Sequence, residues 1–274
     1  MSAFSHRRYR SSVTQRLTSE DAERWYAWLR ERSRDDKGFA GFDVGGWEDS
    51  TWVLHSIFQE PGGDGSVTHD DVLRAALRSG DIVPQSEGER ILHERCSTIG
   101  SSMSMGTPRP GWVRVPWREL ATRLSIDLLG KKYPPSYSWF PHSSWPANLQ
   151  PPNEGTLDLT CLTALIGILS APSRDGRDSP CVASYSPLAN ASRRYEPCAY
   201  EVPLGDIVKL VAPQGDHDGT PSNFWPVDES WMVFTDHDLW GTKVSGPRGL
   251  IDALRASRDL ECIDWAPPSG TPGA

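Results

Sequence analysis

An Asp-His-Asp triplet at residues 236–238 combines side chains that can do acid–base or metal chemistry. Imidazole and carboxylate groups bind divalent metal ions, and a carboxylate can orient a catalytic histidine. In an extended segment Asp236 and Asp238 face one side and His237 the other, so the three converge only if the chain turns there. We keep Asp236, His237 and Asp238 as catalytic candidates if the protein is an enzyme.

A second triplet, Asp216, His217 and Asp218, lies between two glycines. Aspartate next to glycine is typical of an exposed turn, which needs no functional explanation. Because neither triplet has the spacing of a defined metal motif, we assign no metal. The residues of the second triplet remain the candidate metal ligands.

His142 is the third candidate, in the segment Trp-Phe-Pro-His-Ser-Ser at residues 139–144. A histidine beside serines can act as a general base. No Gly-x-Ser-x-Gly elbow surrounds these serines, so a hydrogen-bonded structural histidine is the competing interpretation.

A Trp/Pro-rich pattern occurs twice with the same spacing, beginning at Pro135 and at Pro221. Its tryptophans are Trp139 and Trp145 in the first copy, and Trp225 and Trp231 in the second. The flanking residues do not match, which excludes a domain duplication.

Two interpretations of these tryptophans stay open. Indoles are large and usually buried, so both loops could pack into the core. Trp and Tyr also dominate binding hot spots, so the four indoles and Tyr137 could form a recognition surface. Substituting Trp139 and Trp225 separately distinguishes the two, since only a core residue would be needed for folding.

The net charge of −8 argues against general nucleic-acid binding, which needs cations facing phosphates. The first 16 residues carry four arginines and no acid, so the rest of the chain is more acidic still. Such a body suits a basic protein partner, although acidity also keeps proteins soluble.

The other motif searches give exclusions. We find no Walker A sequence, no His-Glu-x-x-His, no EF-hand loop and no Rossmann glycine pattern, so we assign no cofactor. No apolar run approaches the roughly 20 residues of a membrane span. The five cysteines have no Cys-x-x-Cys pair, which argues against a disulfide framework or a zinc site. We therefore expect a cytoplasmic protein.

Helical spacing predicts helices over 19–34, 70–78, 87–96, 116–124, 156–169 and 247–257. Residues 51–58 read as either a strand or a short buried helix. Short strands are predicted around 181–185, 198–202, 231–235, 241–244 and 260–265. Residues 131–155 hold so many prolines that an ordered, Trp/Pro-rich loop is expected there.

This order predicts an α+β fold with a mainly helical N-terminal half and a mixed strand–helix C-terminal half. We expect a basic tail over 1–17, a single domain over 18–265 with a possible subdivision near 128–155, and a tail over 266–274.

Two functions remain open. The first is a binding protein that recognises a partner through the Trp/Pro loops, such as an acidic neutralising partner of a basic protein. The alternative is a small-molecule enzyme, metal-dependent or not, with an aromatic pocket and a His/Asp site. The ligand in either case is a protein or a small molecule.

Overall fold

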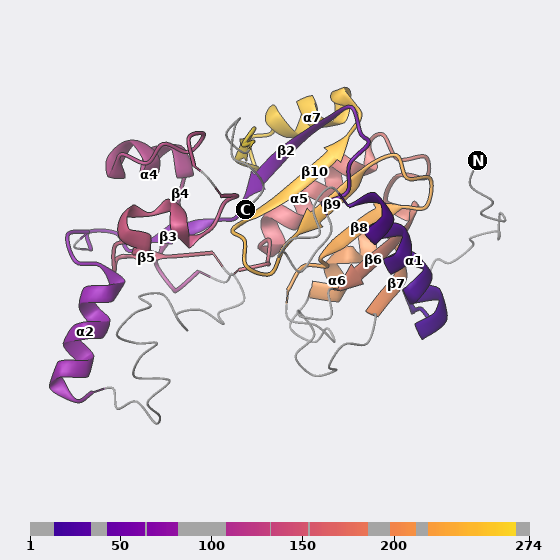
Figure 1. The fold of residues 1–274 in the computed structure, drawn as a ribbon. Helices are drawn as coiled ribbons and strands as arrows, with labels where there is room; N and C mark the ends of the chain where they lie inside the picture. Colours follow the sequence, from indigo (N-terminus) through magenta and orange to yellow (C-terminus); the bar gives the residue numbers. More distant parts are fainter. Residues whose placement is uncertain are drawn as a thin grey trace.

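The structure, a computed structural model, describes residues 14–33, 43–63, 65–81, 108–131, 133–152, 154–185, 198–211 and 219–266. Within these residues the centre of the fold is an eight-stranded antiparallel sheet with the order β1-β7-β6-β8-β9-β10-β2-β11 (Figure 1). Its strands are β1 (Gln15–Arg16), β2 (Asp49–Leu54), β6 (Pro180–Tyr185), β7 (Cys198–Pro203), β8 (Asn223–Pro226), β9 (Met232–Thr235), β10 (Gly241–Gly246) and β11 (Cys262–Ile263).

A second sheet of three described strands has the order β4-β3-β5. It is formed by β3 (Ile57–Gln59), β4 (Val113–Val115) and β5 (Leu149–Gln150). These strands lie to the left of the large sheet in Figure 1, together with α2 (His69–Ser79) and α4 (Trp117–Leu124). Because β3 follows β2 after only two residues, the two sheets are directly connected through the chain.

Helices cover both faces of the large sheet. One face packs against α5 (Leu159–Ser170), α6 (Ile207–Val211) and α7 (Arg248–Arg255), and the other against α1 (Ser19–Arg32). The strand residues alternate accordingly: Val182 and Trp225 face α1, whereas Ala183 and Phe224 face the opposite layer. Four short 3-10 helices complete the described elements: η1 (Tyr137–Trp139), η2 (Pro141–Ser143), η3 (Gly176–Asp178) and η4 (Leu204–Asp206).

The sequence of α5 explains its position. Asp158 caps its first turn by accepting a hydrogen bond from Cys161 N at 3.0 Å, and no residue of the helix is charged.

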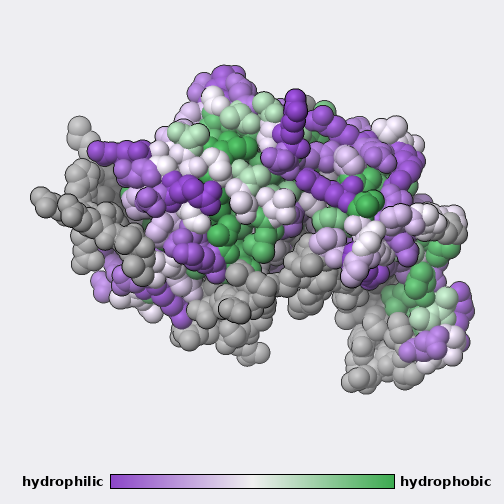
Figure 2. Space-filling model, turned by 180° about the vertical axis from the view of Figure 1, so that it is seen from behind, coloured by the Kyte–Doolittle hydropathy of each residue, from purple (hydrophilic) through white to green (hydrophobic). Residues whose placement is uncertain are grey.

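Seen from behind, the molecule exposes hydrophobic surface near its middle with hydrophilic surface around it (Figure 2). None of the helices in the described ranges is both long and apolar enough to cross a membrane.

Five predicted helices are confirmed as α1, α2, α4, α5 and α7, each within a few residues of the predicted bounds. Thr68 caps α2 in a reciprocal capping box with Asp71. The helix predicted over 87–96 falls outside the described residues.

The prediction of a mainly helical N-terminal half is wrong, because the protein is built around sheets to which that half contributes β1, β2, β3 and β4. Residues 51–58, which were ambiguous, form most of β2 and begin β3. Residues 51–54 of β2 are buried on both faces of the sheet, so the pattern does not alternate, and only pairing with the distant β10 and β11 makes the segment a strand. β1, β3 and β4 are each two or three residues long, too short for a periodic signal.

Candidate functional site

Trp139 and Trp145 lie inside an aromatic cluster beside the three-stranded sheet, with exposures of 0% and 2%. Trp139 packs edge-on against Trp117 with ring centroids 5.8 Å apart, and Trp145 packs edge-on against Trp240 at 5.5 Å. The Trp/Pro-rich segment over 133–152 therefore folds around its own indoles.

The second pair of indoles is also buried, in two other parts of the core. Trp225 stacks on Trp28 of α1 with ring centroids 5.3 Å apart, and Trp231 donates from Nε1 to Ser173 Oγ at 3.2 Å. Of the predicted binding residues, only Tyr137 is exposed, at 39%. The two copies of the pattern therefore do not form one indole surface.

His142 lies at the surface in η2, where its backbone is left-handed with φ 56°. It makes no hydrogen bond, ion pair or ring contact with another described residue. The structure therefore does not join His142 to the Asp-His-Asp triplet at 236–238, and the triplet at 216–218 lies outside the described residues.

Residues 236–238 form a tight turn between β9 and β10. Asp236 organises this turn: its carbonyl accepts from Leu239 N at 3.2 Å and its Oδ1 accepts from Asp238 N at 2.9 Å. The His237 nitrogens lie 3.6 Å from Asp236 Oδ1 and 3.2 Å from Asp238 Oδ1. One ligand atom of each residue lies within 4.8 Å of the others, so the turn achieves the convergence that extended backbone would prevent.

Glu154 and Gly155 lie against this turn, although no sequence pattern connects them with it. Gly155 donates from its N to Leu239 O at 2.9 Å, and a Cβ at this glycine would lie 2.5 Å from the His237 Cα. Burial, with the Asp238 charge added to it, raises the pKa of Glu154 to about 7. We call residues 236–238 with Glu154 the hairpin site; it offers one imidazole and three carboxylates, which suits a divalent cation or a proton transfer near neutral pH.

A groove follows the β11 edge of the large sheet, where two open hollows of about 630 Å³ and about 410 Å³ adjoin. The larger hollow lies against Arg118 and Ala121 of α4 and the apolar residues 126, 128 and 129. The smaller one lies against the start of α4 and residues 257–260 after α7. Both hollows share four lining residues: Arg118, Arg255, Glu261 and Cys262.

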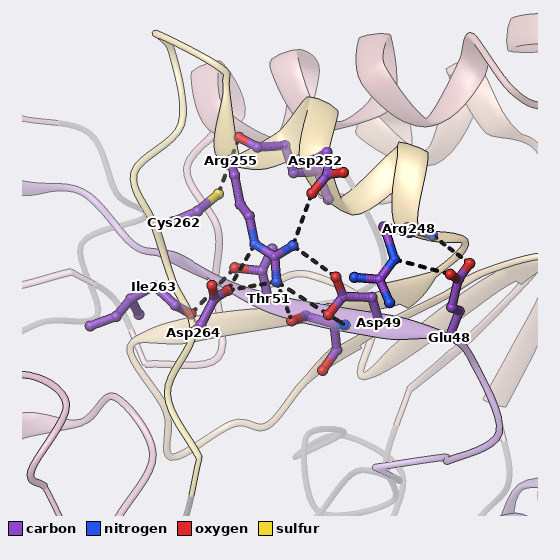
Figure 3. A network of polar contacts seen from close by, with 11 residues as sticks. Glu48, Asp49, Thr51, Arg248, Asp252, Arg255, Cys262, Ile263 and Asp264 are labelled. Atoms are coloured by element: carbon purple, nitrogen blue, oxygen red, sulfur yellow. Dashed lines mark hydrogen bonds and ion pairs between the residues drawn. The ribbon is translucent and has the colours of Figure 1, made fainter.

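Arg255 lines both hollows and lies at the centre of a network of polar contacts (Figure 3). Its guanidinium contacts Asp49 on β2 at 2.8 Å, Asp252 on α7 at 3.1 Å and Asp264 after β11 at 3.1 Å. Hydrogen bonding to Asp49 is the largest of the causes that raise the pKa of Arg255 above its usual range. This network ties α7 to two strands and leaves the Arg255 charge already neutralised.

Glu261 holds the start of α4 in place beside the groove. Its two carboxylate oxygens accept from Trp117 N at 2.7 Å and from Arg118 N at 2.9 Å, the first two amides of α4. Pro116, at the N-cap of α4, supplies no side-chain cap, so this distant carboxylate takes that role.

Three further arginines line the smaller hollow without a carboxylate partner among the described residues. Arg114 Nη1 donates to the backbone carbonyl of Asp259 at 3.0 Å, and the guanidinium groups of Arg118 and Arg258 make no hydrogen bond or ion pair to a described residue. Sequence reasoning did not identify this cluster, because arginine is common throughout the chain and Arg258 is far along the chain from Arg114 and Arg118.

Comparison with protein-family models, with curated proteins and with solved structures gives no match to this chain, so its function is inferred from its own residues.

Proposed function

We propose that the protein is a binding protein, and that the groove along β11 receives its ligand. The observation that carries this proposal is the groove itself, whose larger hollow of about 630 Å³ has the size typical of small-ligand sites. Its lining combines apolar and charged side chains, the mixture found in such sites. The buried Trp/Pro loops would then support the fold and leave contact to other residues.

Leu129→Trp tests the groove. Leu129 is 59% exposed and lines the larger hollow, so a Trp can fill this space with little effect on the core. Ligands are first found by thermal shift with the unmodified chain, since a ligand that binds only the native state raises its melting temperature. We expect the shift to be lost in Leu129→Trp.

Val72→Trp is the matched control, because Val72 is 48% exposed on α2 and lies outside the groove. Ligands should raise the melting temperature of Val72→Trp as they do that of the unmodified chain. Ligands that stabilise both variants equally would contradict the groove as the binding site. A basic protein partner, which the net charge of −8 suggested, would bind elsewhere and would be unaffected by Leu129→Trp.

An enzyme acting at the hairpin site is the second candidate, favoured by the convergence of Asp236, His237 and Asp238 beside Glu154. If these residues hold a cation, Zn²⁺ or Mn²⁺ should raise the melting temperature of the tag-free protein, and His237→Ala should abolish the effect. Equal metal shifts in both proteins would remove the hairpin site as the place of binding.

We also expect a cytoplasmic protein that does not bind nucleic acid in general. The support is the pattern of cysteines without a metal or disulfide spacing, and the excess of acidic over basic residues.

A further inference from the structure

We propose that the smaller hollow binds the phosphate group of a small phosphorylated molecule through Arg114, Arg118 and Arg258; this inference rests on the groove being the ligand site. The hollow is lined by four arginines and one acid, Glu261, in a protein whose net charge is −8. The local excess of positive charge is therefore opposite in sign to that of the whole chain.

Four acids around this hollow already have partners. Both carboxylate oxygens of Glu261 accept hydrogen bonds from the first two amides of α4. Asp49, Asp252 and Asp264 surround Arg255 and neutralise it. Asp259, which is not among the lining residues, accepts from Arg114 with its backbone carbonyl, and its carboxylate makes no ion pair with a described residue.

Arg118 on α4 and Arg258 in the segment after α7 are thus exposed residues whose guanidinium groups are unpaired among the described residues and which line one hollow. A guanidinium presents planar N–H donors that match phosphate oxygens in pairs, and its charge persists at every physiological pH. Arg114, which uses one nitrogen on a backbone carbonyl, has further N–H groups to offer.

Ser257 adds a neutral donor to the same lining. Its Oγ accepts from Asp259 N at 3.2 Å and from Leu260 N at 3.3 Å, and its own O–H donates to no described residue. A hydroxyl held in this way as an acceptor directs its hydrogen away from the loop, so it can donate to an oxygen in the hollow. Three guanidinium groups and a hydroxyl form a set of hydrogen-bond donors around the hollow, which is the chemistry of an oxyanion site.

The size and the surroundings select a small ligand. A hollow of about 410 Å³ lies in the range of small-molecule sites. A long polyanion would extend beyond the hollow over a chain of net charge −8 and be repelled by it.

The test is isothermal titration of the full chain with inorganic pyrophosphate, with citrate as the carboxylate comparison. We expect pyrophosphate to bind and the double substitution Arg118→Gln/Arg258→Gln to weaken it by about tenfold or more. Arg24→Gln is the control, because Arg24 lies on α1, across the sheet, with its side chain 67% exposed. It should bind pyrophosphate like the unmodified chain.

Each failure has its own meaning. No pyrophosphate binding, equal binding by the double variant, or citrate bound as tightly as pyrophosphate would overturn the phosphate inference. If any of these occurs while other ligands still lose their thermal shift in Leu129→Trp, the groove remains the binding site for another class of ligand. If Leu129→Trp also leaves every ligand unaffected, the proposed function falls as well.

Discussion

Glu154 shares a small region of the surface with Asp238, so two carboxylates compete there for ionisation. The pKa of Glu154 is raised to about 7, above that of an ordinary glutamate, so the folded state holds a proton that the unfolded chain releases. The contribution of Glu154 to stability is therefore lost as the pH rises from the unfolded pKa towards neutrality.

Glu154→Gln should remove this loss, because an amide resembles the protonated acid at every pH. We expect the variant to gain about 1 kcal/mol of unfolding free energy above about pH 8, since solvent access reduces the effect of the shift, and to equal the unmodified chain at about pH 4. Urea denaturation at both pH values measures it. Glu31→Gln on α1 is the control, and a gain that does not depend on pH would contradict the assignment.

At the scale of single residues, the sequence identified side chains that could do chemistry but did not predict which residues lie beside them in the fold. Asp236, His237 and Asp238 stood out as chemistry-bearing residues, but their convergence depends on a turn that extended-strand reasoning did not anticipate. Glu154 and Arg258 carried no sequence signal, because each acquires its role from segments that only folding brings near.

Helix α5 depends on one residue at its start. Asp158 accepts from Cys161 N at 3.0 Å and from Ser56 Oγ at 2.7 Å. Burial alone would raise the pKa of this carboxyl, but the hydrogen bonds from Cys161 and Ser56, with the charge of Arg114, outweigh burial and lower the pKa. Its stabilising effect is thus present above the pKa of an unfolded aspartate and is lost as the pH falls through the lower folded value.

Asp158→Ala should lower the unfolding free energy by about 2 kcal/mol at neutral pH, because it removes a cap and leaves Ser56 without its acceptor. Asp158→Asn, which keeps an acceptor oxygen, should recover part of this. Denaturation curves at neutral pH and at about pH 3 measure both, and the cost of Asp158→Ala should shrink in acid. A cost that stays the same at both pH values would mean that the ionised carboxylate is not responsible.

Elements with a local signal were predictable, and elements defined by distant pairing were not. α1, α2 and α5 each have a side-chain cap followed by helically spaced apolar residues, and their sequences alone indicate them. β3 and β4 have three residues each and exist because they pair with one another across more than 50 residues of chain. This difference is why the prediction of helical content in the N-terminal half failed.

The core of the whole molecule is divided into separate clusters. Trp139 belongs to the aromatic cluster beside the small sheet, and Trp225 belongs to the layer between α1 and the large sheet. Their aromatic partners also differ, Trp117 for the first and Trp25 and Trp28 for the second.

Trp139→Leu and Trp225→Leu should each lower the unfolding free energy by about 2–3 kcal/mol, because each leaves a cavity in a different cluster. The double variant should show the sum within about 0.5 kcal/mol, as expected for sites without shared contacts. Guanidinium denaturation of the four proteins measures this. Unchanged stability with lost ligand binding would contradict a core role and restore the indoles as a contact surface.

The position of β2 between β10 and β11 has a consequence during synthesis. β2 ends at Leu54, but its hydrogen-bonding partners begin at Gly241 and Cys262. Both edges of β2 therefore stay unpaired until most of the chain has been synthesised. Two open edges on an apolar strand are the features that chaperones recognise and that promote aggregation. The nascent chain therefore depends on late closure of its sheet, and slow or interrupted translation should be more harmful to its yield than to that of a protein with local strand pairing.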